Sequence, residues 1–180
     1  MPIKGIGGEA YIYATKIKIQ EWGMQGVKSI NIPTSVSCIG NECFSNCTNL
    51  SEITIPSSVS SLGESCFNKC LNLSRITIPT SVSSIGKSCF NSCSNLSEIT
   101  IPTSVSSLGN SCFASCSNLS GITIPSSVSY IGERDLFWCG CFYDCSKLKG
   151  HITIDPNNLT FRTDGTRIYR KDNGNEISVW

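Results

Sequence analysis

The 180-residue sequence has little charge and no excess of either sign. Asp, Glu, Lys and Arg make up 15% of the chain, with 14 basic and 13 acidic residues. Ordinary soluble domains carry roughly 25%. Without a basic surplus the chain has nothing to neutralise a phosphate backbone, so we expect no nucleic-acid binding. It also lacks an apolar run of the roughly 18 residues that a membrane helix needs, so we expect no membrane insertion.

Signals for targeting and for catalysis are equally scarce. The N-terminal residues have neither the apolar core nor the small-residue cleavage site of a secretory signal. No glycine-rich phosphate loop and no strand–nucleophile–helix elbow occurs. His151 is the only histidine, so any nucleophile that needs an imidazole base would have to lie beside it. We therefore expect no enzyme activity and no cofactor.

The chain does have a repeat. An Ile-Pro step recurs every 23 residues, at 32, 55, 78, 101 and 124, and a sixth, altered copy reads ITIDP at 152–156. In each copy the letters I-x-I alternate with period two, which predicts a short strand that the proline ends. Leu62, Cys66, Phe67 and Cys70 recur at spacings that predict one face of a short helical or 3₁₀ turn, with Gly63 at a crowded corner. Such a unit cannot bury its apolar face alone, so the copies must stack into a solenoid.

These copies resemble a known family. The unit LSEITIPSSVSSLGESCFNKCLN at 50–72 looks like the BspA-type leucine-rich repeat, and residues 152–177 are similar to that family's DPNN…DG…Y-K-D segment. The resemblance implies a leucine-rich repeat solenoid used for protein recognition, with a parallel sheet on one face and short helical or 3₁₀ turns and loops on the other. It also implies relatedness to bacterial and protist surface adhesins. One position departs from the family, because its usual alanine is cysteine at 43, 66, 89, 112 and 141.

We expect three segments, with both ends of the solenoid capped. Residues 1–26 are predicted to form an N-terminal β cap, in which alternation of Tyr11, Tyr13, Ile17 and Ile19 indicates a strand pair. Residues 27–149 hold about five repeats, the last with an insertion at 134–139. Residues 150–180 are predicted to form an altered repeat and a β-hairpin cap, because DG and DNG are turn signals.

The twelve cysteines have three readings. Small apolar thiols are often buried, so we favour the interpretation that they pack in the core as reduced thiols. Reduced thiols favour an intracellular location, although the family resemblance also allows the cell surface. Disulfides between rungs are the second, since the rung spacing suits a bridge. The third is a zinc site formed by Cys139, Cys141, Cys145 and His151, whose ligand types suit tetrahedral zinc.

Asn-Leu-Ser occurs four times, at Asn49, Asn72, Asn95 and Asn118, and reads formally as a glycosylation acceptor. Each copy stands at one fixed place in the repeat, just before a buried leucine. We expect these amides to form an internal ladder that satisfies loop backbone, rather than to carry glycans.

The expected function is non-catalytic recognition or adhesion through the sheet face. That face would present a threonine strip flanked by a column of charged residues, and the aromatic insertion is a separate candidate contact site. The strip comprises Asn31, Thr54, Thr77, Thr100, Thr123 and Thr153; the flanking column comprises Glu52, Arg75, Glu98 and His151; and the insertion contributes Leu136, Phe137 and Trp138. The insertion has a second reading as part of the cap. Alternatives for the whole chain are a structural or self-associating solenoid, and a binder of glycan or ice through the threonines.

Overall fold

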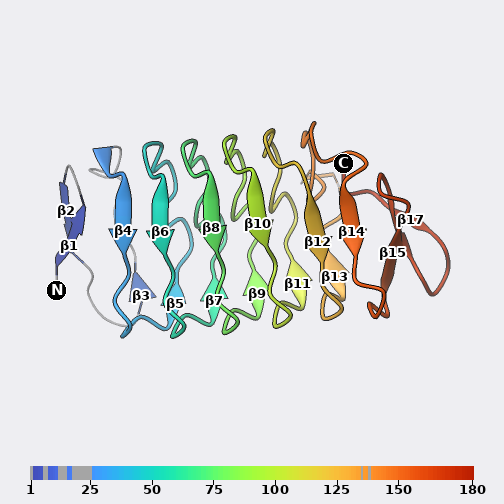
Figure 1. Ribbon diagram of the computed structural model, residues 1–180, viewed down its shortest axis with the longest axis horizontal. Helices are drawn as coiled ribbons and strands as arrows, with labels where there is room; N and C mark the ends of the chain where they lie inside the picture. Colours follow the sequence, from blue (N-terminus) through green and yellow to red (C-terminus); the bar gives the residue numbers. More distant parts are fainter. Residues whose placement is uncertain (1, 6–7, 12–15, 18–25, 135, 138) are drawn as a thin grey trace.

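The computed structural model describes the backbone of residues 2–5, 8–11 and 16–17, and residues 26–134, 136–137 and 139–180 in full. Figure 1 shows successive rungs side by side along the long axis, which confirms the stacked solenoid. No helix in this part of the chain has the length and apolar character that crossing a bilayer requires.

The threonine-bearing strands lie parallel and in register on one face. Each is three residues long because the following proline or turn ends it. A four-stranded sheet has the order β10–β8–β6–β4, and β12 and β14 form a separate pair. These strands are β4 (Ser29–Asn31), β6 (Glu52–Thr54), β8 (Arg75–Thr77), β10 (Glu98–Thr100), β12 (Ile122–Ile124) and β14 (Ile152–Ile154).

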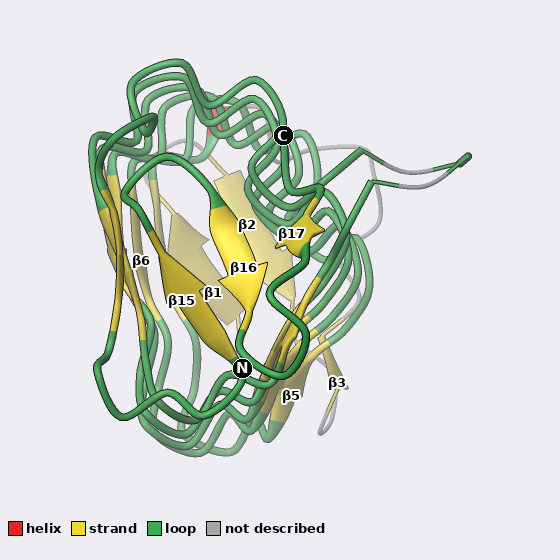
Figure 2. Cartoon of the chain, turned by 90° about the vertical axis from the view of Figure 1, so that its right-hand side faces the viewer, coloured by secondary structure: helices red, strands yellow, loops and turns green. Residues whose placement is uncertain are grey.

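A second parallel sheet runs along another wall of the coil, and the sequence analysis did not predict it. It has six two-residue strands, and the five from β5 onward follow the Pro-x-Ser-Val turn, with one apolar residue of each of these five pointing inward. Viewed along the long axis, the two sheets form separate walls (Figure 2). The strands are β3 (Lys16–Ile17), β5 (Cys38–Ile39), β7 (Ser61–Leu62), β9 (Ser84–Ile85), β11 (Ser107–Leu108) and β13 (Tyr130–Ile131).

The expected helical or 3₁₀ turns are replaced by a chain of tight turns. Apart from Gly26, no residue that the structure describes is helical. Two non-glycine residues in each of the first four copies have positive φ, such as Ser65 (54°) and Lys69 (59°), and Asp144 (58°) does in the last copy. Alternate amides donate to the next rung, as Phe67 N does to the carbonyl of Cys89 at 2.8 Å. A helix cannot form because those amides bond across rungs instead of within one turn.

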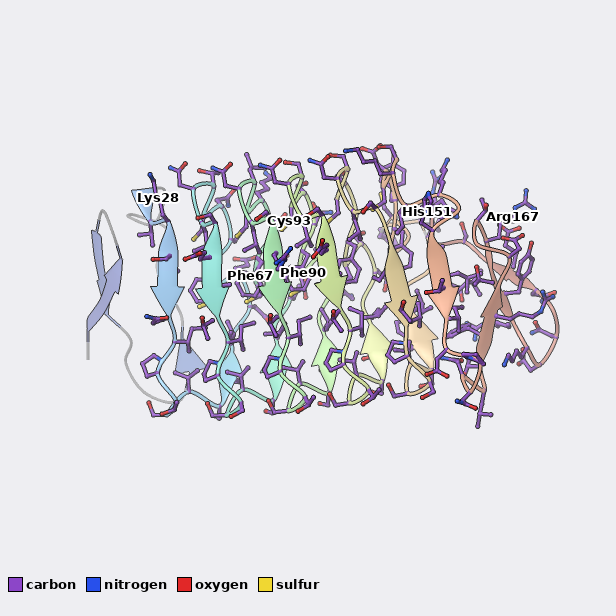
Figure 3. The ribbon with its side chains drawn as sticks, in the orientation of Figure 1. Lys28, Phe67, Phe90, Cys93, His151 and Arg167 are labelled. Atoms are coloured by element: carbon purple, nitrogen blue, oxygen red, sulfur yellow. The ribbon has the colours of Figure 1, made fainter. Side chains whose placement is uncertain are left out.

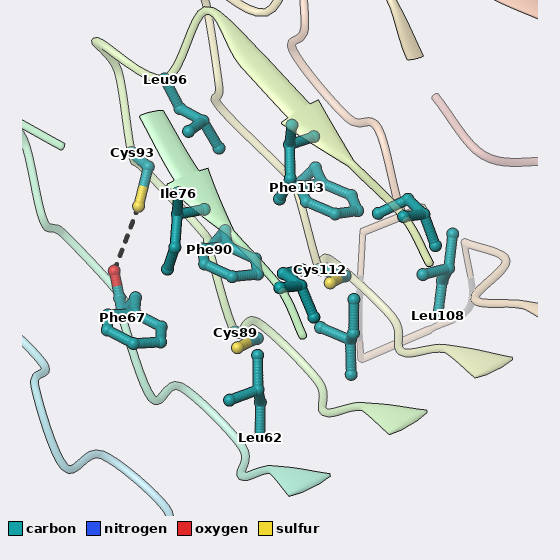
Figure 4. Packing of buried hydrophobic residues seen from close by; sticks show 14 of the residues in the cluster. Leu62, Phe67, Ile76, Cys89, Phe90, Cys93, Leu96, Leu108, Cys112 and Phe113 are labelled. Atoms are coloured by element: carbon teal, nitrogen blue, oxygen red, sulfur yellow. Dashed lines mark hydrogen bonds between the residues drawn. The ribbon is translucent and has the colours of Figure 1, made fainter. Parts of the chain in front are cut away.

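The core is a set of columns, one residue of each kind per rung. Figure 4 shows phenylalanines, cysteines and leucines from neighbouring rungs packed together, and each of these labelled residues is buried. The phenylalanine rings stack with centroids 5.2 to 5.9 Å apart, and the Trp180 ring follows 6.3 Å from Phe142, tilted by 49°. Inward packing of Leu62, Cys66, Phe67 and Cys70 is confirmed, although no helix places them.

Gly63 and its equivalents stand where two rungs approach most closely. A Cβ built on Gly63 would lie 2.5 Å from the carbonyl carbon of Gly40, and one on Gly86 would lie 2.7 Å from that of Gly63. Real Cβ atoms do not approach so closely. The expected crowded corner is therefore present, and it is glycine because adjacent backbones touch there.

The ends of the solenoid carry antiparallel strands. At the N-terminal end, β1 (Pro2–Gly5) pairs with β2 (Gly8–Tyr11) and lies beside β4. Tyr11 ends β2 and Ile17 belongs to β3, which pairs with β5, so these two do not form the expected strand pair. Tyr13 and Ile19 lie outside the described residues.

The C-terminal end carries a three-stranded antiparallel sheet that lies across the solenoid (Figure 2). Its strands are β15 (Phe161–Thr163), β16 (Ile168–Arg170) and β17 (Glu176–Ile177). Phe142 N donates to the carbonyl of Val179 at 2.8 Å, as Phe67 N donates to the next rung. Residues 178–180 thus stand in for the neighbour that the last rung would otherwise have.

The positive-φ positions give a stability prediction. Lys69 is exposed and pays the steric cost of a left-handed conformation, so Lys69→Gly should raise the free energy of unfolding by about 0.5–1 kcal/mol. Glu64→Gly, an exposed position without positive φ, should lower it by about 0.5–1 kcal/mol. Urea titrations of both variants measure these two changes in the free energy of unfolding. Changes in the same direction for both variants would contradict the prediction.

Candidate recognition face

The threonine strip lies on the solvent side of the first sheet. In β6, β8 and β10 the central isoleucine is buried and the residues on either side are exposed. Asn31 pairs in register with Thr54, Thr54 with Thr77 and Thr77 with Thr100. At the C-terminal end, Thr123 pairs with Thr153, and their hydroxyl oxygens lie 2.7 Å apart. The structure therefore brings all six predicted strip residues into one exposed line.

The flanking column runs parallel to the strip. Arg75 Nη2 lies 2.9 Å from Glu98 Oε2, which confirms that opposite charges stand beside each other in these two rungs. Their side chains are 72% and 66% exposed, so the pair contributes at most about 1 kcal/mol. Glu52 lies one rung before Arg75, and His151 precedes β14 (Figure 3). The column is thus solvated and open to a partner.

The insertion presents two apolar side chains to solvent. Leu136 is 95% exposed and Phe137 is 86% exposed. That exposure contradicts the cap reading for these two residues, since a cap would bury them against the last rung. Trp138 lies outside the described residues. Large exposed apolar side chains on a loop are typical of contact sites.

The predicted zinc ligands are separated by the fold. Cys141 and Cys145 point into the core, whereas Cys139 is half-buried and His151 is exposed on the sheet face. Cys145 Sγ donates to the carbonyl of Phe113 at 2.9 Å. In residues 26–134, 136–137 and 139–180 no group of three or more candidate ligands could hold a metal ion. This arrangement therefore does not form the zinc site, because two of its four candidate ligands, Cys141 and Cys145, are buried in the core.

The asparagines of the Asn-Leu-Ser copies form a ladder of a different kind from the one expected. Nδ2 of Asn72 donates to Oδ1 of Asn49, and the same 3.4 Å contact recurs at Asn95 and Asn118. Lys147 Nζ closes the ladder on Oδ1 of Asn118 at 2.6 Å. The ladder runs between side chains at the surface, rather than from side chains to loop backbone in the interior.

Comparison with known proteins agrees with this geometry. The model of the BspA type leucine rich repeat region matches residues 15–149 with six copies. The chain belongs to the BspA-type leucine-rich repeat family. Comparison with curated proteins gave no match.

Solved bacterial structures share this BspA-type fold. A leucine-rich repeat protein of T. pallidum is 29% identical over 75% of this chain, with a TM-score of 0.66. One from Bacteroides ovatus is 29% identical over 85%, also with a TM-score of 0.66. A leucine-rich cell surface protein of Faecalibacterium prausnitzii, at 23% identity over 99% and a TM-score of 0.65, shares the fold. The chain spans 62%, 40% and 52% of these proteins respectively.

The cysteines that depart from the BspA pattern behave as core thiols. Cys66, Cys89 and Cys112 are free and fully buried. In the last four copies the second cysteine of the CFxxC unit donates a hydrogen bond to backbone, as Cys93 Sγ does to the carbonyl of Phe67 at 3.1 Å (Figure 4). Burial raises the pKa of the Cys47 thiol to about 11 and that of Cys145 to about 12, because desolvation disfavours a thiolate. These protonated, enclosed thiols are poor nucleophiles and poor metal ligands.

Two features of this BspA-type chain were not predicted from its sequence. Gly121 replaces the side chain that the flanking column carries in neighbouring rungs, and the substitution is visible when SGITIP is set against SEITIP. Asn158 is fully buried and makes four hydrogen bonds that hold the C-terminal segment. Its local sequence gives no sign of partners 30 and 33 residues away.

Proposed function

We propose that this chain is a non-catalytic recognition or adhesion module that binds a protein partner through the threonine strip and its flanking column. The observation that supports this most directly is the exposed line of Asn31 and the threonines, which is in register from Asn31 to Thr100 and again from Thr123 to Thr153. Rigid scaffolds bind with little loss of conformational entropy, because their contact groups are already positioned. The exposed tip at Leu136 and Phe137 offers a second, separate contact.

The character of the face predicts how it binds. Its strip is made of neutral hydroxyls and one amide, and its charges nearly cancel. Binding should therefore depend on shape and hydrogen bonds, and change only weakly between low and moderate salt. A loss of binding over that range would contradict the proposal.

The test is capture of partner proteins by wild type and by paired variants. Thr77→Lys with Thr100→Lys adds two charges to the strip and should weaken capture by about tenfold or more. The matched control is Ser83→Lys with Ser106→Lys, at exposed positions near the second sheet, which should leave capture unchanged. Equal loss in both pairs would contradict a site on the first sheet.

A triple alanine variant at Leu136, Phe137 and Trp138 separates the two contacts. Loss of capture in this variant alone would place the site on the insertion. If the solution mass of the chain rises with concentration and the captured protein is the chain itself, the structural, self-associating alternative replaces the proposal. Binding to glycan arrays or inhibition of ice recrystallisation by the unmodified chain would favour the alternative that the threonines bind glycan or ice.

The compartment is open to the same kind of test. Free, buried thiols favour a reducing compartment, whereas the cell-surface description of the F. prausnitzii protein supports the surface. Surface labelling of intact cells distinguishes these two locations.

A further inference from the structure

The flanking column has a gap at Gly121. At this position neighbouring rungs carry side chains, and the register of β12 with β14 places Gly121 opposite His151. On the other side the next rung carries Glu98. The residues of the column in chain order are Ser29, Glu52, Arg75, Glu98, Gly121 and His151.

The first sheet is interrupted at the same place. β10 is the last strand of the four-stranded sheet and β12 begins the next pair, with no ladder between them in the part of the chain that the structure describes. Figure 1 shows β12 set apart from β10. A groove of about 760 Å³, here called the β10–β12 groove, lies between the two strands. The missing side chain and the missing ladder together open it.

The lining of the β10–β12 groove combines apolar and acidic groups. Ile99 and Ile122 contribute apolar surface, and Thr100 and Thr123 contribute hydroxyls. Among the described residues that line it, Glu98 and Asp155 carry carboxylates, His151 carries an imidazole, and none is Lys or Arg. A long side chain with an aliphatic stem and a cationic head complements both properties.

Glu98 already shows the contact that such a head would make. Its Oε2 accepts the guanidinium of Arg75 at 2.9 Å from the neighbouring rung. Both side chains are mostly exposed, so this pair is weak and a second guanidinium can compete for the carboxylate. By contrast, the smaller groove between β6 and β8 is lined by Arg75 itself, which would repel a cation.

We propose that the β10–β12 groove receives an arginine side chain of the protein partner. This inference rests on the proposed function and names the group that would anchor the partner. The arginine stem lies over Gly121 and its guanidinium pairs with Glu98, while Asp155 adds a second negative charge to the lining of the groove.

The probe is the peptide acetyl-Thr-Arg-Thr-amide, titrated into the intact chain and followed by amide chemical shifts. We expect saturable shifts at Gly121 and Thr123, and no saturable shift with the peptide in which citrulline replaces arginine. Citrulline keeps the shape of arginine and removes its charge. Equal shifts with both peptides, or none with either, would overturn the proposal.

Two variants localise the site. Gly121→Leu fills the groove, and the fold tolerates it because a Cβ there meets only the His151 carbonyl oxygen, at 3.7 Å; peptide binding should be lost. Glu98→Gln should weaken binding roughly two- to fivefold. Glu52→Gln, in the same column but outside the groove, is the matched control and should bind as wild type does.

The protein partner distinguishes this inference from the function on which it rests. If Thr77→Lys with Thr100→Lys abolishes partner capture while Gly121→Leu and Glu98→Gln leave it intact, the arginine anchor is wrong and the recognition function stands. If the arginine peptide binds in the groove but no variant alters partner capture, the groove binds arginine and the proposed recognition function is wrong.

Discussion

Raising the pH from 7 to 10 is expected to lower the free energy of unfolding by about 10 kcal/mol, enough to unfold most domains of this size. The cause is the buried thiols. Burial raises the pKa of seven of them above the ordinary value of 9.0, at Cys47, Cys66, Cys70, Cys93, Cys112, Cys116 and Cys145.

The sign follows from which state holds the protons. Below pH 9 the thiols are protonated in both the folded and the unfolded chain, so their protonation does not change stability. Between pH 9 and about 11 the unfolded chain loses protons that the folded chain must keep, and each thiol then favours unfolding. At pH 10 each contributes about 1.4 kcal/mol, since one pH unit corresponds to 1.36 kcal/mol.

Urea titrations at pH 7, 8, 9 and 10 in the presence of a reductant measure this loss. The matched control is Cys66→Ala with Cys112→Ala, which installs the residue that is usual in the family and removes two titrating thiols. The loss between pH 7 and 10 should shrink by about 3 kcal/mol in that variant. A free energy of unfolding that is equal at pH 7 and pH 10 would show that the thiols are not buried in their protonated form.

Asn158→Ala is expected to lower the free energy of unfolding by about 4 kcal/mol and to loosen the C-terminal segment. Nδ2 of Asn158 donates to the carbonyls of Pro125 and Val128 at 2.8 and 2.9 Å. Its Oδ1 accepts from Thr160 N and Phe161 N at 2.9 and 2.8 Å. Removing this fully buried amide takes a partner from the Val128 carbonyl and from the amides of Thr160 and Phe161, whereas the Pro125 carbonyl keeps its bond from Val128 N at 3.2 Å.

Asn157→Ala is the control for this prediction. Asn157 is the neighbouring residue, is exposed and keeps its backbone bond to Asp155 Oδ1 at 2.8 Å in the variant. The Asn157→Ala substitution should lower the free energy of unfolding by less than about 0.5 kcal/mol. Thermal unfolding and limited proteolysis of the C-terminal segment compare the two, and similar stability of both variants would contradict a structural role for Asn158.

The period of 23 residues was enough to predict the solenoid, and the resemblance of the repeated unit to the BspA type predicted the family. Residues one period apart lie in adjacent rungs, so a repeat in the sequence is also a repeat of contacts, and the columns of Phe67 and Phe90 follow from it. The exposed line of threonines follows for the same reason, because I-T-I alternates and only its isoleucines can face the core. Cysteine burial was predictable from residue type and from its place beside phenylalanine.

The turns and the second sheet were not predictable in this way. The spacing of Leu62, Cys66, Phe67 and Cys70 suits a helical turn, but hydrogen bonds between rungs compete for the amides that a helix would use. Strands of two residues, such as β7 at Ser61–Leu62, are too short for alternation to indicate them. Their hydrogen-bond partners exist only once the rungs have stacked.

The sequence by itself determined the rung, the residues that face inward and the strip that faces out, because all of these depend on contacts that repeat every 23 residues. The tertiary structure decided what happens where the repeat is broken. Leu136 and Phe137 of the insertion are exposed to solvent, the Asn158 side chain bonds to Pro125, 33 residues earlier, and the sheet opens beside Gly121. Each of these depends on how non-equivalent backbones pack against each other, which no local pattern encodes.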